Sequence, residues 1–248
     1  MRGLEWLTAR PIAHRGLHDA AKGIVENAAS AFNAAIAGKY AIECDLQVTA
    51  DGEAMVHHDG ALGRLTEGSG RLDAMSTADL RQVRHKATAD GMLTLGELCD
   101  LVSSRVALVI ELKSRFDRDI RLVRRAASVL AGYAGPAALM SFDPAQIAAL
   151  RQIAPKLPRG IVAESRGRQR DKGPLVWQAR SSVAYCRHAL AAHPQFLAYA
   201  VSDLPATIPF VAQTLLGLPL LTWTVRSGED RKRAARWADQ MIFEGFSP

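Results

Sequence analysis

Short apolar runs alternate with helical patterns along most of this chain, and that alternation limits the folds open to it. An apolar pair at residues 12–13 is followed by a helical pattern over 28–37, where Phe32 and Ile36 lie one turn apart, and then by a strand pattern over 40–48. This order is typical of parallel sheets, because parallel strands need a long crossover connection. Further strand patterns occur at residues 54–57, 106–112, 137–142, 159–162, 196–201, 220–225 and 241–244.

The strand pattern at residues 54–57 does not fit a parallel sheet. Only residues 49–53 separate it from the preceding strand, whereas a parallel crossover takes about a dozen residues or more. Asp51-Gly52 in this connection is typical of a hairpin turn, so we expect residues 54–57 to pair antiparallel with residues 40–48. Eight parallel strands then remain, which is the number that closes a (β/α)8 barrel, or TIM barrel.

The length of the chain agrees with this fold. A TIM barrel takes about 250 residues, so 248 residues predict a single barrel domain over residues 1–248. Between residues 60 and 91 glycines and one weak helical pattern interrupt the rhythm of strands and helices. We interpret about residues 59–92 as a small insertion after the second strand and its hairpin.

Two helix starts carry capping signals. Thr94 with Glu97 three residues later is typical of a capping box, in which each side chain accepts a hydrogen bond from the other residue's backbone N–H. Asp143 precedes a proline that suits the first helical position, and Gln146 stands where a capping-box partner would. We expect helices to begin at both places.

The charge of the chain allows several kinds of partner. A net charge of +6 with a pI of about 9.5 suits nucleic acid, an anionic membrane surface or a phosphorylated substrate, and also a merely solvated basic surface. The sequence contains no familiar nucleic-acid-binding motif and no apolar run of membrane-spanning length. We therefore expect a small-molecule substrate, no nucleic acid and no stable membrane insertion, with a homo-oligomer left open.

The cysteines and the first ten residues indicate the cellular compartment expected for the protein. Cys44, Cys99 and Cys186 are widely spaced, which argues against a disulfide framework and against a thiolate zinc site. Residues 1–10 lack the continuous apolar region of a signal peptide. The expected location is cytoplasmic.

Three carboxylates stand near the ends of predicted strands. Glu43 and Asp45 are two residues apart on one strand, so their side chains point to the same face, and Glu111 ends another strand. The carboxyl ends of barrel strands carry the active site. Three carboxylates without a thiolate favour a hard cation, Mg²⁺ or Ca²⁺, although Glu-x-Asp alone would more simply be surface charge.

Histidines and cations complete the strand-end pattern. His14 ends the first strand and His58 the hairpin, and two histidines beside carboxylates suit general acid and base catalysis. His57 competes with His58, because alternation along the strand turns only one of them toward the site. Arg15 and Lys113 would supply cationic donors, although Arg15 could equally pair with Glu26 and Lys113 could be solvated. Trp223 ends the seventh strand, where it would wall an organic group or pack in the barrel core.

Taken in order, these segments resemble the glycerophosphodiester phosphodiesterase family. The match runs in register over about residues 10–115 and returns near residue 219. Each piece is weak alone, and the ordered set is very specific. The matching segments are Ala13-His14-Arg15-Gly16, Val25-Glu26-Asn27-Ala28-Ala29-Ser30-Ala31-Phe32, Glu43-x-Asp45, Asp51-Gly52, Val56-His57-His58-Asp59, Leu95-x-Glu97, Glu111-Leu112-Lys113 and Trp223-Thr224-Val225.

The resemblance implies a TIM barrel and a metal-dependent hydrolase that releases glycerol 3-phosphate and an alcohol from glycerophosphodiesters. It also implies a reaction through a cyclic phosphate intermediate, in which two histidines exchange the roles of acid and base. It selects His58 over His57. By position, it implies metal ligands at Glu43, Asp45 and Glu111, an acid/base pair at His14 and His58, a phosphate contact at Arg15, and contacts to phosphate and glycerol at Lys113 and Trp223.

Two parts of the chain depart from the family pattern. Residues 160–205 do not align, and we interpret the basic segment 164–188 as either a solvated face or a binding region for an anionic alcohol group. At the C-terminus Phe243 and Glu244 stand where the family has a hydroxyl residue and an aspartate. Two alternatives stay open beside the phosphodiesterase: a lysophospholipase D-like hydrolase, and a catalytically idle barrel that binds an anion.

Overall fold

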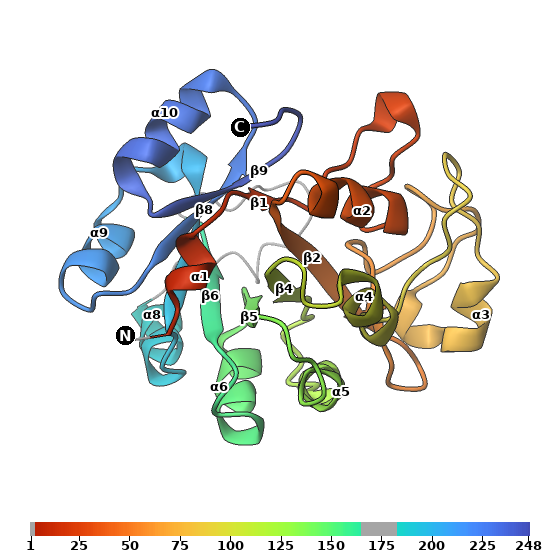
Figure 1. Cartoon of the computed structure of the whole chain (residues 1–248). Coiled ribbons are helices and arrows are strands. Elements are labelled where there is room, and N and C mark those ends of the chain that lie inside the picture. The colour runs from red at the N-terminus through yellow and green to blue at the C-terminus, as the bar shows by residue number, and fades with distance from the viewer. Residues whose placement is uncertain (1–2, 165–182) are drawn as a thin grey trace.

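The strands form a closed barrel in the computed structural model, which describes residues 3–164 and 183–248, with only the backbone of 183–186 (Figure 1). Within this part of the chain the sheet order is β1-β9-β8-β7-β6-β5-β4-β2-β3, and β1 also pairs with β2, which closes eight parallel strands into a ring. The strands are β1 (Ile12–Ala13), β2 (Ala41–Val48), β3 (Ala54–Val56), β4 (Leu108–Leu112), β5 (Ala137–Ser141), β6 (Arg159–Ala163), β7 (Phe196–Ala200), β8 (Leu220–Val225) and β9 (Gln240–Phe243).

The predicted TIM barrel is therefore confirmed, including its surplus strand. β3 pairs antiparallel with β2, with Leu46 opposite Val56 and Val48 opposite Ala54, so it lies outside the ring of eight. Every predicted strand is present within about two residues of its expected bounds. The short connection at Asp51-Gly52 thus fixed the direction of β3, as expected for a hairpin.

Helices surround the barrel and shield the outer face of its strands (Figure 1). Short 3₁₀ turns occur at Ala20–Lys22, Leu72–Ala74 and Val201–Asp203. No helix among the described residues is both long enough and apolar enough to span a membrane. The helices are α1 (Glu5–Thr8), α2 (Ala29–Ala37), α3 (Thr77–Arg81), α4 (Leu95–Val102), α5 (Arg121–Leu130), α6 (Pro144–Ile153), α8 (Val183–Ala191), α9 (Thr207–Thr214) and α10 (Gly228–Trp237).

The predicted cap of α4 is present, and that of α6 is only partly so. Thr94 and Glu97 form both bonds of a capping box. Asp143 accepts from the Ala145 backbone at the start of α6, but Gln146 is not its capping-box partner. The Gln146 amide donates instead to the Asp119 carbonyl at 2.8 Å, because this side chain is buried against the loop before α5 and finds its acceptor there.

Strand alternation divides the buried apolar residues into two sets. Alternate residues on the outer face pack against helices such as α2, α4 and α5, and include Ile42, Cys44 and Ile110. Their neighbours point inward and fill the barrel together with Leu7 of α1. The inward set includes Ile12, Ala41, Val109, Ala138, Val162, Leu221 and Ile242.

Residues 59–92 form the predicted insertion, which projects from the side of the barrel that carries α3 (Figure 1). Its apolar side chains form a small cluster of their own, with Leu72, Leu80 and Met92 packed around Met55 of β3. The hairpin strand thus anchors the insertion to the barrel.

Candidate active site

The inward alternation of the strands places every predicted site residue of the barrel strands at one end. Ile12, Val109 and Leu221 point into the barrel and are aliphatic. The next inward position on each of these strands, two residues later, is polar or aromatic. This end is the carboxyl end of the parallel strands, where TIM barrels carry their active sites. Every second residue along a strand points inward, and toward the carboxyl end these inward residues are His14 after β1, Glu43 and Asp45 on β2, Glu111 and then Lys113 at β4, Trp223 on β8 and Glu244 after β9.

The structure brings the three predicted metal ligands together. Asp45 lies opposite Glu111 in the register of β2 and β4, and Glu43 precedes Asp45 on the same inward face. One carboxylate oxygen of each lies within 4.8 Å of the others. All three are buried, with exposed fractions of 2%, 1% and 8% for Glu43, Asp45 and Glu111. Buried carboxylates require charge compensation, from cations or from a metal ion.

Two cationic side chains supply part of that compensation. Lys113 Nζ lies 2.7 Å from Asp45 Oδ1 and 2.8 Å from Glu111 Oε1. Arg15 Nε lies 3.0 Å from Asp45 Oδ2. The Asn27 amide also donates to Asp45 Oδ2 at 2.9 Å. Lys113 is therefore part of the cluster and not the solvated side chain that its sequence context also allowed.

The carboxylates differ in how well their charge is matched. Burial and the charges of Asp45 and Glu111 raise the pKa of Glu43 well above its usual range. Burial also acts to raise the pKa of Asp45, but the cations of Lys113 and Arg15 outweigh it and hold that pKa well below its ordinary value. The protein's own cations therefore match the charge of Asp45 closely, whereas Glu43 is left in an environment that disfavours its charged form.

The chemistry of the donors fits a hard divalent cation. The cluster offers carboxylate oxygens from Glu43, Asp45 and Glu111 and no sulfur or imidazole ligand, which are the donors that Mg²⁺ and Ca²⁺ prefer. The raised pKa of Glu43, caused first by burial and then by the charges of Asp45 and Glu111, agrees with this fit, because a bound cation would favour the charged carboxylate. Lys113 holds the two other carboxylates in register for such an ion.

The loop after β1 is shaped by two unusual backbone conformations. Arg15 has a φ of +56°, and its backbone N–H donates to Glu43 Oε2 at 3.1 Å. Gly16 follows with a φ of +79°, and a Cβ here would lie 2.8 Å from the Ala31 carbonyl carbon. Only glycine fits at this position, because the left-handed conformation and the close approach of α2 both exclude a side chain. The turn aims the Arg15 amide at the carboxylates.

The Arg15 side chain pairs with Glu26, as its sequence context allowed, and also reaches the carboxylate cluster. Its Nη1 donates to Glu26 Oε1 at 2.7 Å while its Nε faces Asp45. Burial acts against ionisation of Glu26, but Arg64 and Arg15 together lower its pKa to about 2. Glu26 therefore stays ionised and holds the Arg15 guanidinium over the carboxylate cluster.

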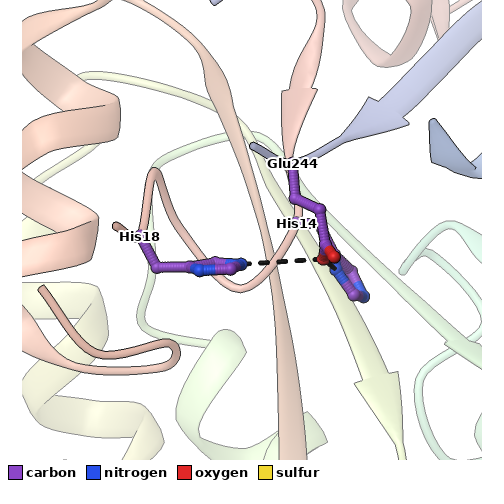
Figure 2. A group of neighbouring side chains, drawn as sticks. All are labelled: His14, His18 and Glu244. Carbon is purple, nitrogen blue, oxygen red and sulfur yellow. Dashed lines mark hydrogen bonds and ion pairs between the residues drawn. The ribbon is translucent and has the colours of Figure 1, made fainter. Parts of the chain in front are cut away.

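His14 lies between the carboxylate cluster and the end of β9. Its Nδ1 forms a hydrogen bond with Glu244 Oε2 (Figure 2). Its Nε2 lies 4.0 Å from Glu43 Oε2. Burial lowers the pKa of His14 even though Glu244 favours the charged form. A neutral imidazole with its proton on Nδ1 leaves Nε2 free to accept a proton at the side of the carboxylates.

His58 follows the hairpin strand β3, close enough to Asp45 for its charge to act on that carboxylate, and has its own acidic partner. Its Nδ1 lies 2.8 Å from Asp59 Oδ1, and a third of its side chain is exposed. His57 is 3% exposed, and burial lowers its pKa to about 4. His57 is thus kept neutral in the interior, and His58 is the neighbour that is open to solvent and oriented by a carboxylate.

Trp223 packs inside the barrel, which is one of the two positions considered for it. Its ring packs edge-on against Phe142 with 5.5 Å between centroids, inside the barrel. Its indole Nε1 is buried and has no hydrogen-bond partner among residues 3–164 and 183–248. An unpaired indole N–H at the active-site end is available to a ligand oxygen.

Sequence reasoning missed three contributors to the site. Asn27 holds Asp45, His18 lies beside Glu244, and Glu244 itself was noted only as a departure from the family ending. The spacing of His18 four residues after His14 was the available signal, but a short loop gives no periodicity to interpret. Of the basic segment, residues 165–182 lie outside the described residues, and Arg187 is exposed on α8.

Comparison with known proteins identifies one family. The model of the glycerophosphoryl diester phosphodiesterase family matches residues 14–246. A "probable glycerophosphodiester phosphodiesterase 1" of Mycobacterium tuberculosis is 28% identical over 178 residues, which are 62% of this chain and 64% of the relative's own length. A glycerophosphodiester phosphodiesterase of Caldanaerobacter subterraneus is 33% identical over 111 residues, which are 42% of this chain and 44% of the relative.

Solved structures share the fold at low sequence identity. A phosphodiesterase of Oleispira antarctica, solved in complex with its product sn-glycerol-3-phosphate, has a TM-score of 0.77 at 19% identity and covers 96% of this chain and 94% of its own. A glycerophosphodiester phosphodiesterase of Parabacteroides distasonis has a TM-score of 0.73 at 18% identity, with coverage of 94% and 92%. At these identities the likeness establishes the barrel and its topology.

Proposed function

The chain belongs to the glycerophosphoryl diester phosphodiesterase family, and from this premise we propose that it hydrolyses glycerophosphodiesters to glycerol 3-phosphate and an alcohol. One observation carries the proposal: three buried carboxylates, two cations and two carboxylate-paired histidines meet at one end of the barrel. The binding of sn-glycerol-3-phosphate by the Oleispira antarctica enzyme supports the same class of product here.

Glu43, Asp45 and Glu111 would hold a divalent cation, Mg²⁺ or Ca²⁺. When bound, such an ion neutralises charge on the diester phosphate, so that an oxygen nucleophile can approach phosphorus. Arg15 donates further hydrogen bonds to the phosphate from the rim of the cluster, where Glu26 orients it. Lys113 lies at the same cluster and adds positive charge beneath the phosphate. The Trp223 indole N–H is available to a glycerol hydroxyl.

The two histidines divide the proton transfers. One imidazole removes the proton from the glycerol 2-hydroxyl, whose oxygen attacks phosphorus and forms a cyclic phosphate, while the other protonates the departing alcohol oxygen. Water then opens the ring with the roles reversed, so each histidine returns to its first protonation state. Glu244 and Asp59 bind the Nδ1 atoms of His14 and His58, which leaves each Nε2 for this exchange.

A substrate panel tests the proposal. The purified chain is assayed on glycerophosphodiesters with different alcohols, with Mg²⁺, Ca²⁺ or Mn²⁺ and with a chelator, and release of glycerol 3-phosphate is measured. We expect His14→Ala and His58→Ala each to lower the rate at least about 10²-fold, whereas His188→Ala, an exposed position on α8, leaves it unchanged. Full activity in either active-site variant, or in the chelator, would overturn the assignment.

A further inference from the structure

A second group of metal-ligand atoms lies beside the carboxylate cluster. His14, His18 and Glu244 each offer one ligand atom, and these atoms lie within 4.8 Å of one another. Figure 2 shows the ring of His18 pointing across its loop toward the carboxylate of Glu244, which also meets His14. The three side chains come from the end of β1, the loop after it and the end of β9.

One atom of this group is unsatisfied. His18 Nε2 is buried and has no hydrogen-bond partner among the described residues, and the closest carboxylate oxygen, Glu244 Oε2, is 3.6 Å away. Buried polar atoms in native proteins are almost always paired, and an orphan is ordinarily explained by a water or an ion. The separation of 3.6 Å is too long for a good hydrogen bond but suits two ligands of one small cation.

The donors differ in kind from those of the carboxylate cluster. Two imidazole nitrogens and one carboxylate oxygen are the ligands of many zinc sites that keep a fourth position open. The other oxygen of Glu244 accepts from Arg226 Nε at 2.5 Å, which fixes the carboxylate as outer partners do around zinc ligands. The Arg226 side chain is 47% exposed, so water screens its charge at this site.

We propose that His14, His18 and Glu244 form a second metal site, which takes a borderline transition-metal ion such as Zn²⁺ and is distinct from the carboxylate site for Mg²⁺ or Ca²⁺. Binding at His14 Nδ1 displaces the proton that this atom shares with Glu244. That proton, the only one of the neutral imidazole, moves to Nε2, so His14 can no longer accept one there. If the proposed function holds, Zn²⁺ at this site inhibits the enzyme.

Metal stoichiometry tests the site without reference to activity. The full chain is dialysed against Zn²⁺ in a large excess of Mg²⁺, and bound zinc is counted. We expect His18→Ala and His18→Gln to bind one equivalent fewer than the unaltered chain, while the exposed-histidine control His188→Ala binds the full number. Co²⁺ should give a visible absorption band of a tetrahedral nitrogen and oxygen site that both His18 variants lack. Equal zinc binding and equal Co²⁺ spectra in the chain and the His18 variants would overturn the proposal.

Inhibition is measured separately, with each protein's own rate in Mg²⁺ alone as reference. We expect His18→Ala to need at least about tenfold more Zn²⁺ for half-inhibition than the unaltered chain. If the chain hydrolyses no diester, the proposed function fails while the zinc count and the Co²⁺ spectrum still decide the metal site. Identical inhibition curves for the two proteins would contradict the assignment of His18 as a ligand.

Discussion

At the scale of single residues, His14 shows how opposing influences set one protonation state. Burial lowers its pKa, whereas the hydrogen bond from its Nδ1 to Glu244 acts to raise it. The net result is a neutral ring whose proton faces Glu244 and whose Nε2 faces the carboxylate cluster. Glu244 is thus a positioning residue in our interpretation, and it takes this place although the family pattern has an aspartate there.

Replacing Glu244 by glutamine tests that positioning role. The amide can donate to Nδ1 as well as accept from it, so the proton of His14 is no longer confined to Nδ1. We expect kcat to fall at least about tenfold with little change in KM, and Glu244→Asp to retain more activity than Glu244→Gln. Glu229→Gln, at an exposed position on α10, serves as the control. A lowered kcat shared equally by the Asp and Gln variants would indicate a merely structural role.

From the contacts of Lys113 we expect the thermal stability of its variants to depend on bound metal. Its ammonium compensates Asp45 and Glu111, so Lys113→Met leaves buried negative charge unpaired, at a cost of about 3–5 kcal/mol in the free energy of unfolding. We expect the melting temperature to fall more in a chelator than in Mg²⁺, because a cation held by the carboxylates replaces the lost charge. Lys22→Met, at a 74% exposed side chain, is the control. An equal loss in both buffers would contradict a metal site at these carboxylates.

At the scale of elements, the sequence pattern predicted the features that depend on neighbouring residues in the chain. The alternation of β2 and the short Asp51-Gly52 turn were sufficient to place Glu43 and Asp45 on one face and to reverse β3. The contact of His14 with Glu244 was not predictable in the same way. It joins residues 230 apart in the chain, and exists only because β1 pairs with β9 when the barrel closes.

Gln146 illustrates the opposite failure. Its spacing from Asp143 satisfied a local rule, but tertiary packing offered its amide another acceptor at Asp119. The insertion was predicted as a segment, whereas its contacts with the site were not, because an irregular loop has no period from which a facing side chain can be inferred. These contacts converge on Arg64, which lies 2.6 Å from both Glu26 Oε1 and Asp59 Oδ2.

Arg64 therefore connects the insertion with the partners of two proposed active-site residues. Glu26 holds Arg15, and Asp59 holds His58. We expect Arg64→Met to lower kcat/KM about tenfold through misplaced partners, while the free energy of unfolding changes by less than about 1 kcal/mol, since this side chain is 46% exposed. The control is Arg71→Met, which loses an exposed pair with Asp73 in the same insertion. Equal values of kcat/KM in the two variants would show that the contacts of Arg64 do not affect catalysis.

At the scale of the whole molecule, the barrel interior is divided along its axis. The end near α1 is filled by aliphatic side chains such as Ile12 and Val109, and the opposite end by ionisable ones. Buried ionisable groups make the free energy of unfolding depend on pH wherever the folded and unfolded chains bind protons differently. His57, directly after the hairpin strand β3, is such a group and has no role in the proposed chemistry.

The pH dependence of stability provides the last prediction. Burial lowers the pKa of His57 from 6.5 in the unfolded chain to about 4 in the folded one. Above pH 6.5 neither form is protonated and the histidine has no effect. Below it the unfolded chain takes up the proton first, so stability falls until about pH 4, where the folded form is protonated too. Between pH 7.5 and 5 this one group should remove about 2 kcal/mol.

Urea unfolding at the two pH values measures the effect. His57→Gln cannot take up this proton, so we expect its free energy of unfolding to fall by about 2 kcal/mol less than that of the unaltered chain on acidification, whatever its stability at pH 7.5. His193→Gln, at an exposed position, should follow the unaltered chain. If His57→Gln and the unaltered chain lose the same amount, His57 binds its proton as easily when folded as when unfolded. The side chain of His57 would then be accessible to water in the folded chain.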